Sequence, residues 1–125
     1  MRNNYINSYY SVIGLLAILA ITLAEELYSD KYDYIKVEDI LGNDRLREQY
    51  YKCFMDTGPC VTPDAQFFRT HIGESIVTKC RRCTEKQKEN FDKVITWYTE
   101  NQPEEWHALV EKFVKDATKK DQAAK

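Results

Sequence analysis

Four cysteines are the residues of this sequence with the clearest chemical potential, and they follow the spacing C-x6-C-x19-C-x2-C at positions 53, 60, 80 and 83. Cysteines can form disulfides, bind zinc or carry out thiol exchange. A four-cysteine zinc site usually has two close C-x2-C pairs, and only one is present here. The segment Cys80-Arg81-Arg82-Cys83 has the form of a redox motif, but such motifs belong to βαβ units and no strand-like alternation surrounds this one. Disulfides are therefore the expected state, provided that the chain meets an oxidising compartment.

The N-terminal residues predict that compartment. Arg2 is the only charged residue before position 25, and Val12–Ala24 is an apolar run of 13 residues. A helix needs ~20 residues to cross a bilayer, so the run fits the core of a secretory signal better than a retained membrane anchor. Small side chains at Thr22 and Ala24 predict cleavage after Ala24. Residues 1–24 are thus interpreted as a signal peptide, and residues 25–125, with all four cysteines, as a secreted, extracellular domain.

Four cysteines allow three pairings, and their spacing alone does not choose among them. Proximity favours Cys53 with Cys60 and Cys80 with Cys83, which close loops of 8 and 4 residues. Chain entropy assigns such loops about 2.5 and 2 kcal/mol, against about 3.7 kcal/mol for a loop from Cys53 to Cys83. Local bridges would stabilise corners of the fold, so the packing of helices must hold distant elements together.

Composition limits the class of protein and its partners. A chain of 125 residues with 43% apolar residues is one globular domain. Its 18 basic and 20 acidic side chains give no field of one sign, which argues against a nucleic acid partner. Loss of Arg2 with the signal leaves 17 basic residues and a net charge of −3, which also disfavours a membrane-active protein and stable membrane insertion.

Helical periodicity runs through the chain after residue 36. Helix starts are predicted at Asn43, at Thr62-Pro63, at Thr84 with Gln87 as a capping box, and at Pro103. The apolar stripes of the five predicted helices are Val37, Ile40 and Leu41; Leu46, Tyr50, Cys53 and Phe54; Ala65, Phe68, Ile72, Ile76 and Cys80; Phe91, Val94, Ile95 and Tyr98; and Trp106, Leu109, Val110 and Phe113.

Two further signals refine this prediction. Gly73 interrupts the third helix and indicates a bend or the close approach of a neighbour. From Val114 the chain is polar without an apolar stripe, which predicts a frayed helical end or a polar tail over about 114–125. The predicted fold is all-α, a compact bundle of five to six short helices.

An ordered set of motifs in this chain resembles the insect chemosensory protein family, also called OS-D-like, over about residues 28 to 113. The motifs are Lys31-Tyr32-Asp33, Val37-Glu38-Asp39-Ile40-Leu41, Asn43-Asp44-Arg45-Leu46, the corner from Cys53 to Gly58-Pro59-Cys60, the run from Cys80 and Cys83 to Lys88, and Pro103-Glu104-Glu105-Trp106.

The resemblance implies a compact fold of about six helices with disulfides Cys53–Cys60 and Cys80–Cys83. It also implies a secreted carrier with an internal apolar channel for long-chain fatty acids, alcohols, esters, and pheromone- or odorant-like molecules. By position, Tyr50 is similar to the family's channel-mouth tyrosine, and Trp106 to the aromatic residue of its Pro-Glu-Glu-Trp motif.

The sequence departs from the family pattern in three places. Val61 lengthens the gap between the second and third cysteines from the usual 18 residues to 19, and Gly73 stands where members often have proline. The usual Asp-Pro-x-Gly-x-Tyr/Trp-Arg segment is missing after Phe113. Pocket size and ligand length are therefore the implied properties that transfer least.

Aromatic residues on the inner stripes are either ordinary core or the wall of a ligand cavity. Apolar cavities with such walls are where lipids bind, and 13 aromatics lie after residue 24. Tyr50 and Tyr98 are the strongest candidates, because a phenol offers an apolar face and one hydrogen bond. The predicted ligand-binding residues are Leu46, Tyr50, Phe54, Phe68, Ile72, Ile76, Val94, Ile95, Tyr98 and Trp106.

The remaining chemistry-bearing residues have ordinary explanations. His71 and His107 lack metal-ligand spacing and are interpreted as packing or surface residues. The basic residues near the third cysteine could attract a carboxylate but are expected to be solvated; they are Lys79, Arg81, Arg82, Lys86 and Lys88.

The sequence offers no nucleophile elbow, paired-carboxylate motif or phosphate loop, so no enzyme activity, metal or cofactor is predicted. The expected function is transport of small hydrophobic ligands by a monomer. The alternative is a secreted interaction or signalling protein in development or defence, with the cavity incidental; the sequence does not identify a receptor.

Overall fold

The structure, a computed structural model, describes residues 26–124, and every regular element in that range is a helix. The predicted signal peptide, residues 1–24, lies outside the described residues. The helices are α2 (Val37–Leu41), α3 (Asp44–Phe54), α4 (Pro63–Thr78), α5 (Glu85–Asn101) and α6 (Pro103–Ala124). The predicted all-α class is confirmed.

The predicted helix starts are confirmed by their caps. The side chain of Asn43 accepts a hydrogen bond from the N–H of Leu46 at the start of α3, and Thr62 caps α4 in the same way. At α5, Thr84 accepts from the N–H of Gln87 while the Gln87 side chain accepts from the N–H of Thr84, which is a complete capping box. Short-range polar signals therefore set where these helices begin.

The end of α4 differs from the prediction, which carried its apolar stripe on to Cys80. The helix ends at Thr78, because Lys79 and Cys80 adopt left-handed backbone angles, with φ of 56° and 62°. The Cys80 N–H then bonds to the Ser75 carbonyl, a typical helix-closing arrangement. Cys80 consequently lies in the turn between α4 and α5, not on the helix.

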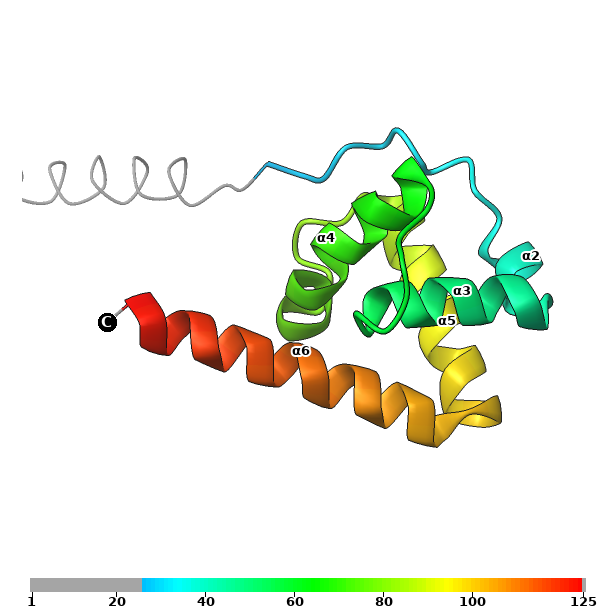
Figure 1. The fold of residues 1–125 in the computed structure, drawn as a ribbon. Helices are drawn as coiled ribbons and strands as arrows, with labels where there is room; N and C mark the ends of the chain where they lie inside the picture. Colours follow the sequence, from blue (N-terminus) through cyan, green and yellow to red (C-terminus); the bar gives the residue numbers. More distant parts are fainter. Residues whose placement is uncertain (1–25, 125) are drawn as a thin grey trace, which may run out of the picture.

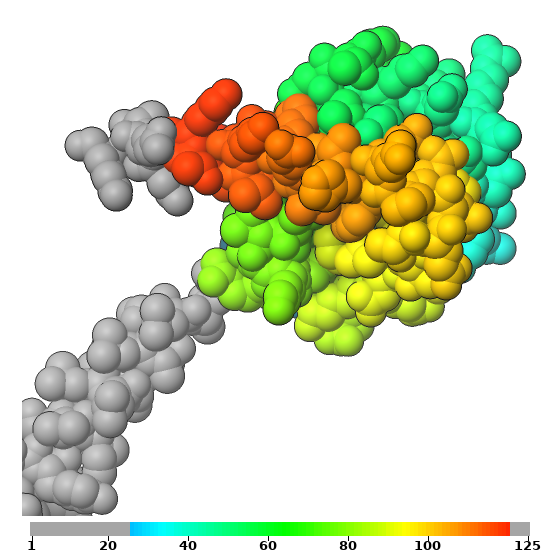
Figure 2. All heavy atoms as spheres, turned by 90° about the horizontal axis from the view of Figure 1, so that it is seen from below, coloured from blue at the N-terminus to red at the C-terminus, as the bar shows by residue number. Residues whose placement is uncertain are grey.

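The helices pack around a common centre. Helix α6 packs against α4 and α5, α3 packs against α4, and the short α2 packs against α3 and α5. The segment 26–36 passes over α4 before it reaches α2 (Figure 1). Helix α6 lies across one side of the bundle, and its C-terminal part projects beyond the other helices (Figure 2).

The sequence predicted a frayed helical end or a polar tail over about 114–125, and the structure has helix as far as Ala124. Side-chain pairs one turn apart stabilise this stretch: Lys112 lies 2.9 Å from Asp116, and Lys115 lies 2.8 Å from Glu111. A polar sequence with such pairs can form a helix without an apolar stripe.

At Gly73, α6 comes very close to α4. A Cβ built on Gly73 would lie 2.9 Å from Cδ1 of Phe113, whose side chain is buried. The absence of a side chain thus lets an aromatic ring of α6 rest on the backbone of α4. This confirms the close approach of a neighbour that the sequence indicated.

Replacing Gly73 tests this contact. Gly73→Ala should lower the free energy of unfolding by up to about 2 kcal/mol, because the cost of overpacking, about 1–3 kcal/mol, is offset only in part by the gain in helix propensity of about 1 kcal/mol. Urea unfolding followed by circular dichroism measures the change. In a protein that already carries Phe113→Leu, Gly73→Ala should cost less stability than it does in wild type, because the clashing ring is gone. A Gly73→Ala protein more stable than wild type would contradict the contact.

Asp56 joins the end of α3 to α4 and α6. Its carboxylate lies 2.7 Å from Nη2 of Arg69 and 3.0 Å from Nζ of Lys112. Hydrogen bonds from Arg69, then from Lys112, lower the pKa of Asp56 to about 2. The carboxylate is thus more acidic in the folded chain than in the unfolded one, whose value is ~3.9.

This shift predicts a pH-dependent contribution to stability. The ionised Asp56 should stabilise the fold above about pH 4, and the contribution should be lost as the pH falls from about 4 toward 2. Since the side chain is 57% exposed, the loss in Asp56→Asn should be about 1 kcal/mol or less at neutral pH. Melting temperatures across pH 2–7 measure it. Glu48→Gln, on the exposed side of α3, is the control; a difference between Asp56→Asn and wild type that stays constant across this range would contradict the prediction.

Candidate functional site

A cavity of about 160 Å³ lies at the centre of the bundle, bounded by the segment before α2 and by all five helices. Its wall is made chiefly of aromatic rings and aliphatic side chains. Seven of the ten predicted ligand-binding residues line it: Tyr50, Phe54, Phe68, Ile72, Val94, Tyr98 and Trp106.

The other three predicted residues, Leu46, Ile76 and Ile95, are half-buried and do not line the cavity. Helix geometry explains this. The lining positions are 47, 50, 51 and 54 on α3; 68, 72 and 75 among those on α4; and 87, 91, 94 and 98 among those on α5. Each set follows one face at i, i+3 or i+4, and i+7. A residue beside such a face, such as Leu46, turns toward a neighbouring helix or the rim.

Several lining residues were not among the predicted ligand-binding set. Phe91 and Leu109 carried the necessary signal, since both belonged to predicted apolar stripes. Arg47, Ser75 and Gln87 share the helical spacing of the lining faces but are polar, so a search for apolar stripes passes over them. Their positions would have been found only by following the spacing without regard to residue type.

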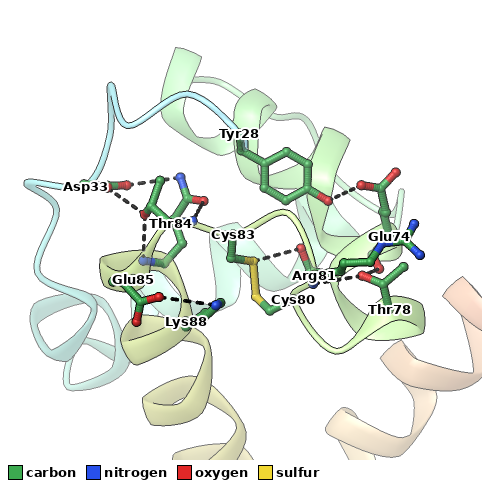
Figure 3. The surroundings of a disulfide bond; sticks show 12 residues. Tyr28, Asp33, Glu74, Thr78, Cys80, Arg81, Cys83, Thr84, Glu85 and Lys88 are labelled. Atoms are coloured by element: carbon green, nitrogen blue, oxygen red, sulfur yellow. Dashed lines mark hydrogen bonds and ion pairs between the residues drawn. A yellow bond between two sulfur atoms is a disulfide. The ribbon is translucent and has the colours of Figure 1, made fainter. Parts of the chain in front are cut away.

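The segment before α2 closes one side of the cavity. Tyr28 is 7% exposed, and its ring lies 4.2 Å from the ring of His71 on α4. Its hydroxyl donates to Oε1 of Glu74 at 2.5 Å, and its N–H donates to the carbonyl of Arg82 at 2.8 Å. Figure 3 shows Tyr28 reaching Glu74 across the end of α4. Burial, followed by the hydrogen bond to Glu74, raises the pKa of Tyr28 to about 12, so the phenol is neutral at physiological pH.

The same segment is held a second time at the start of α5. Oγ1 of Thr84 donates to Asp33 at 2.8 Å, and Nε2 of Gln87 donates to Asp33 at 3.1 Å and to the Ser29 carbonyl at 2.8 Å. The contacts of Asp33 with the start of α5 are visible in Figure 3. The capping box of α5 therefore also anchors the cover of the cavity.

Both predicted disulfides, Cys53–Cys60 and Cys80–Cys83, are confirmed. The second pair borders the cavity, and Sγ of Cys83 lies 3.6 Å from Oγ of Ser75. Cys80 and Cys83 form one buried cluster with Tyr28, against which Phe67 and Phe91 pack. This disulfide is thus part of the cavity wall as well as a brace for the turn between α4 and α5.

Tyr50 places a phenol on the wall, and its hydroxyl reaches the start of α4. The hydroxyl donates to Oδ2 of Asp64 in the first turn of α4. Burial, then the hydrogen bond to Asp64, raises the pKa of Tyr50 well above its usual value. Burial acts to raise the pKa of Asp64, but the hydrogen bonds from Tyr50 and Thr62 outweigh it and lower that pKa. The pair is therefore a neutral phenol beside a carboxylate anion.

Another part of the wall, around Tyr98, is aromatic. Tyr98 is buried, with its ring centroid 6.3 Å from Tyr51 and 6.1 Å from Trp106. Burial, with a smaller contribution from the charge of Glu105, raises the pKa of Tyr98 to about 12. The hydroxyl of Tyr51 donates to the Glu105 carbonyl at 3.0 Å. These rings give this end of the cavity rigid apolar faces.

Arg47 is a buried cation on the wall. Its Nη1 donates to the Leu41 carbonyl at 2.7 Å, and its Nη2 lies 3.0 Å from Asp44. Its guanidinium carbon lies 4.3 Å from the centroid of Trp97. The protein itself therefore satisfies the charge on this part of the wall, as a buried ion requires.

The histidines take the structural places expected of them. His71 packs between Tyr28 and Phe67, and burial lowers its pKa. The side chain of His107 is 83% exposed. Within residues 26–124, no group of three or more histidine, cysteine or acidic residues has the arrangement of a metal site.

The basic residues near Cys80 do not line the cavity. Arg82 pairs with Glu74 at 3.3 Å and Lys88 with Glu85 at 3.3 Å, and both contacts lie at the surface. No helix in the described part of the chain is long and apolar enough to span a membrane.

Comparison with known proteins agrees with this architecture. Residues 28–121 match the family described as the insect pheromone-binding family, A10/OS-D. The chain is 43% identical over 106 residues to ejaculatory bulb-specific protein 3 of Drosophila melanogaster, covering 84% of this chain and 83% of that protein.

Two solved structures are also similar. A chemosensory protein in complex with bromo-dodecanol has 33% sequence identity and a TM-score of 0.66, covering 76% of this chain and 94% of that one. The antennal chemosensory protein A6 of the moth Mamestra brassicae has 33% identity and a TM-score of 0.59, covering 78% of this chain and 94% of that one.

Proposed function

Since the chain belongs to the insect pheromone-binding family A10/OS-D, we propose that it carries long-chain hydrophobic molecules in the cavity between its helices. The family and the solved relatives support the role of a small-ligand carrier. The observation that carries the finer proposal is the composition of the wall, where rings and aliphatic groups surround the cavity. Such a site favours molecules with large apolar surfaces.

The polar groups of the wall support this proposal because the protein already satisfies most of them. Asp33 accepts from Thr84 and Gln87, and Arg47 is held by Leu41 and Asp44. A ligand that enters therefore need not supply partners for buried charges, and its apolar part can contact apolar atoms. Fatty acids, alcohols, esters, and pheromone- or odorant-like molecules share that apolar part.

The size of the cavity adds a requirement to the proposal. At about 160 Å³, it is comparable to an engineered apolar cavity of about 150 Å³ that binds benzene. A dodecyl chain has twice the carbon atoms of benzene. Uptake of a chain as long as that of the bromo-dodecanol bound by the relative therefore requires wall side chains or the covering segment to shift.

The proposal extends to where the protein works. Two disulfides and the family support secretion after removal of residues 1–24. We further propose that the chain acts as a monomer. The cavity offers no catalytic constellation that would support an enzymatic role. If ligand binding fails in every assay, a surface interaction or signalling role becomes the better explanation.

Binding itself is the first test. Burying a C12 to C16 chain at ~0.8 kcal/mol per CH₂ gives about 10–13 kcal/mol, and the loss of translational and chain freedom leaves about −8 kcal/mol, a micromolar Kd. The mature, disulfide-bonded protein should bind the fluorescent probe N-phenyl-1-naphthylamine, and dodecyl to hexadecyl ligands should displace it. Failure of every chain length to displace the probe contradicts the carrier proposal.

A cavity-filling variant tests the place of binding. Ile72 lines the cavity from α4, so Ile72→Trp should occupy the space and weaken ligand binding at least tenfold while the helical circular dichroism spectrum persists. Val77, on the same helix, is 52% exposed and does not line the cavity. Val77→Trp is therefore the matched control and should bind as wild type does. Unchanged affinity in Ile72→Trp, with a sharply lowered melting temperature, would show that this stripe is ordinary core.

A further inference from the structure

The rim of the cavity at Tyr50 differs chemically from the rest of the wall. The ring of Tyr50 lines the cavity, but its hydroxyl proton is donated to Asp64, which stands behind it at the start of α4. A phenol has one proton to donate, and its oxygen keeps lone pairs that can accept. At this rim the protein therefore offers a ligand a hydrogen-bond acceptor, not a donor.

The carboxylate of Asp64 fixes that polarity. It is half-buried and accepts from Tyr50, a charge-assisted hydrogen bond that a neutral ligand oxygen would not outcompete. Thr62, the cap of α4, also hydrogen-bonds to Asp64. Because these contacts favour the ionised form, a negative charge stands directly behind the hydroxyl of Tyr50. A second negative charge brought to the rim would be repelled.

The basic side chains of the wall are poorly suited to compensate an anionic ligand, and burial lowers the pKa of His71, the one lining histidine of the described chain. Among the lining residues of the described chain, Arg47 alone carries an arginine or lysine side chain. Its guanidinium is engaged by the Leu41 carbonyl, by Asp44 and by the face of Trp97. A fatty acid anion would thus have to break existing contacts, whereas an alcohol needs only an acceptor.

We propose that the Tyr50–Asp64 pair sets the head-group preference of the cavity, so that long-chain ligands with a hydroxyl group bind in preference to ligands of the same length with a carboxylate. The inference rests on the proposed function and makes it more specific. The ligand hydroxyl donates to the Tyr50 oxygen, and its chain extends along the aromatic and aliphatic wall. Asp64 acts as a specificity-determining residue because it commits the Tyr50 proton and repels anions.

The test compares 1-dodecanol with dodecanoate at pH 8, by displacement of N-phenyl-1-naphthylamine from the mature protein. The chains are of equal length, so the comparison isolates the head group. In wild type, 1-dodecanol should bind at least tenfold more tightly than dodecanoate. Asp64→Asn should reduce this ratio to threefold or less, mainly by tightening the binding of dodecanoate.

A matched control removes an acidic residue from the first turn of a different helix. Glu104 is exposed in the first turn of α6 and does not line the cavity, so Glu104→Gln should keep the wild-type ratio. A second test variant, Tyr50→Phe, leaves Asp64 in place and removes the acceptor. It should weaken 1-dodecanol binding several-fold with little effect on dodecanoate, and it covers the case in which Asp64→Asn fails to fold.

The outcomes distinguish failure of the head-group proposal from failure of the carrier function. Wild-type protein that binds dodecanoate as tightly as 1-dodecanol, or an Asp64→Asn variant that folds and keeps the wild-type ratio, overturns the head-group proposal and leaves the carrier function standing. If neither ligand displaces the probe and no other chain length does, the carrier function fails, and the head-group proposal fails with it.

Discussion

The rest of the structure depends on the corner that the Cys80–Cys83 disulfide braces between α4 and α5. The chain reverses there with Lys79 and Cys80 in left-handed conformations, so α5 returns beside α4 and not away from it. At this corner the carbonyl of Arg82 accepts a hydrogen bond from the N–H of Tyr28. One short loop therefore orients two helices, supplies sulfur atoms to the cavity wall and anchors the segment that covers the cavity (Figure 3).

The cover shows how an apolar cavity can persist in a small protein. Residues 26–36 lack the periodicity of a helix, and local packing alone would not order them. They are held because Tyr28 buries its ring against His71, while Glu74, Thr84 and Gln87 satisfy the polar groups of the segment. Each of these bonds replaces one to water, so its net contribution is about 0.5–1.5 kcal/mol. Several such bonds together hold the segment, yet each contributes so little that displacing the segment costs only a modest free energy.

The sequence predicted local features well and the cavity only in part. Caps at Asn43, Thr62 and Thr84 are signals within four residues, and the structure has all of them. Leu46 belongs to a predicted apolar stripe but does not line the cavity. An apolar stripe predicts which face of a helix is buried, but it does not predict which residues of that face point into a cavity and which pack against another helix.

Long-range contacts account for the other differences between sequence and structure. Nothing adjacent to Arg47 in the sequence indicates that a charged side chain is buried under Trp97, since that contact joins α3 to α5. The left-handed turn at Lys79, by contrast, is a local helix-closing arrangement, which the apolar spacing up to Cys80 does not reveal. A residue pattern along one helix therefore does not reveal which of its side chains are buried by contacts with other helices.

The course of α6 explains why its second half contributes nothing to the cavity. Its lining residues, Trp106 and Leu109, both lie in the first two turns, and the helix then crosses α4 where Phe113 rests on Gly73. After Pro103 the sequence contains neither proline nor glycine, so nothing breaks the helix after that crossing and it continues straight to Ala124. A helix that continues straight leaves the bundle and cannot fold back over the cavity. Beyond its first two turns, α6 therefore adds nothing to the capacity of the site, which is set by α2 to α5, the covering segment, and Trp106 and Leu109.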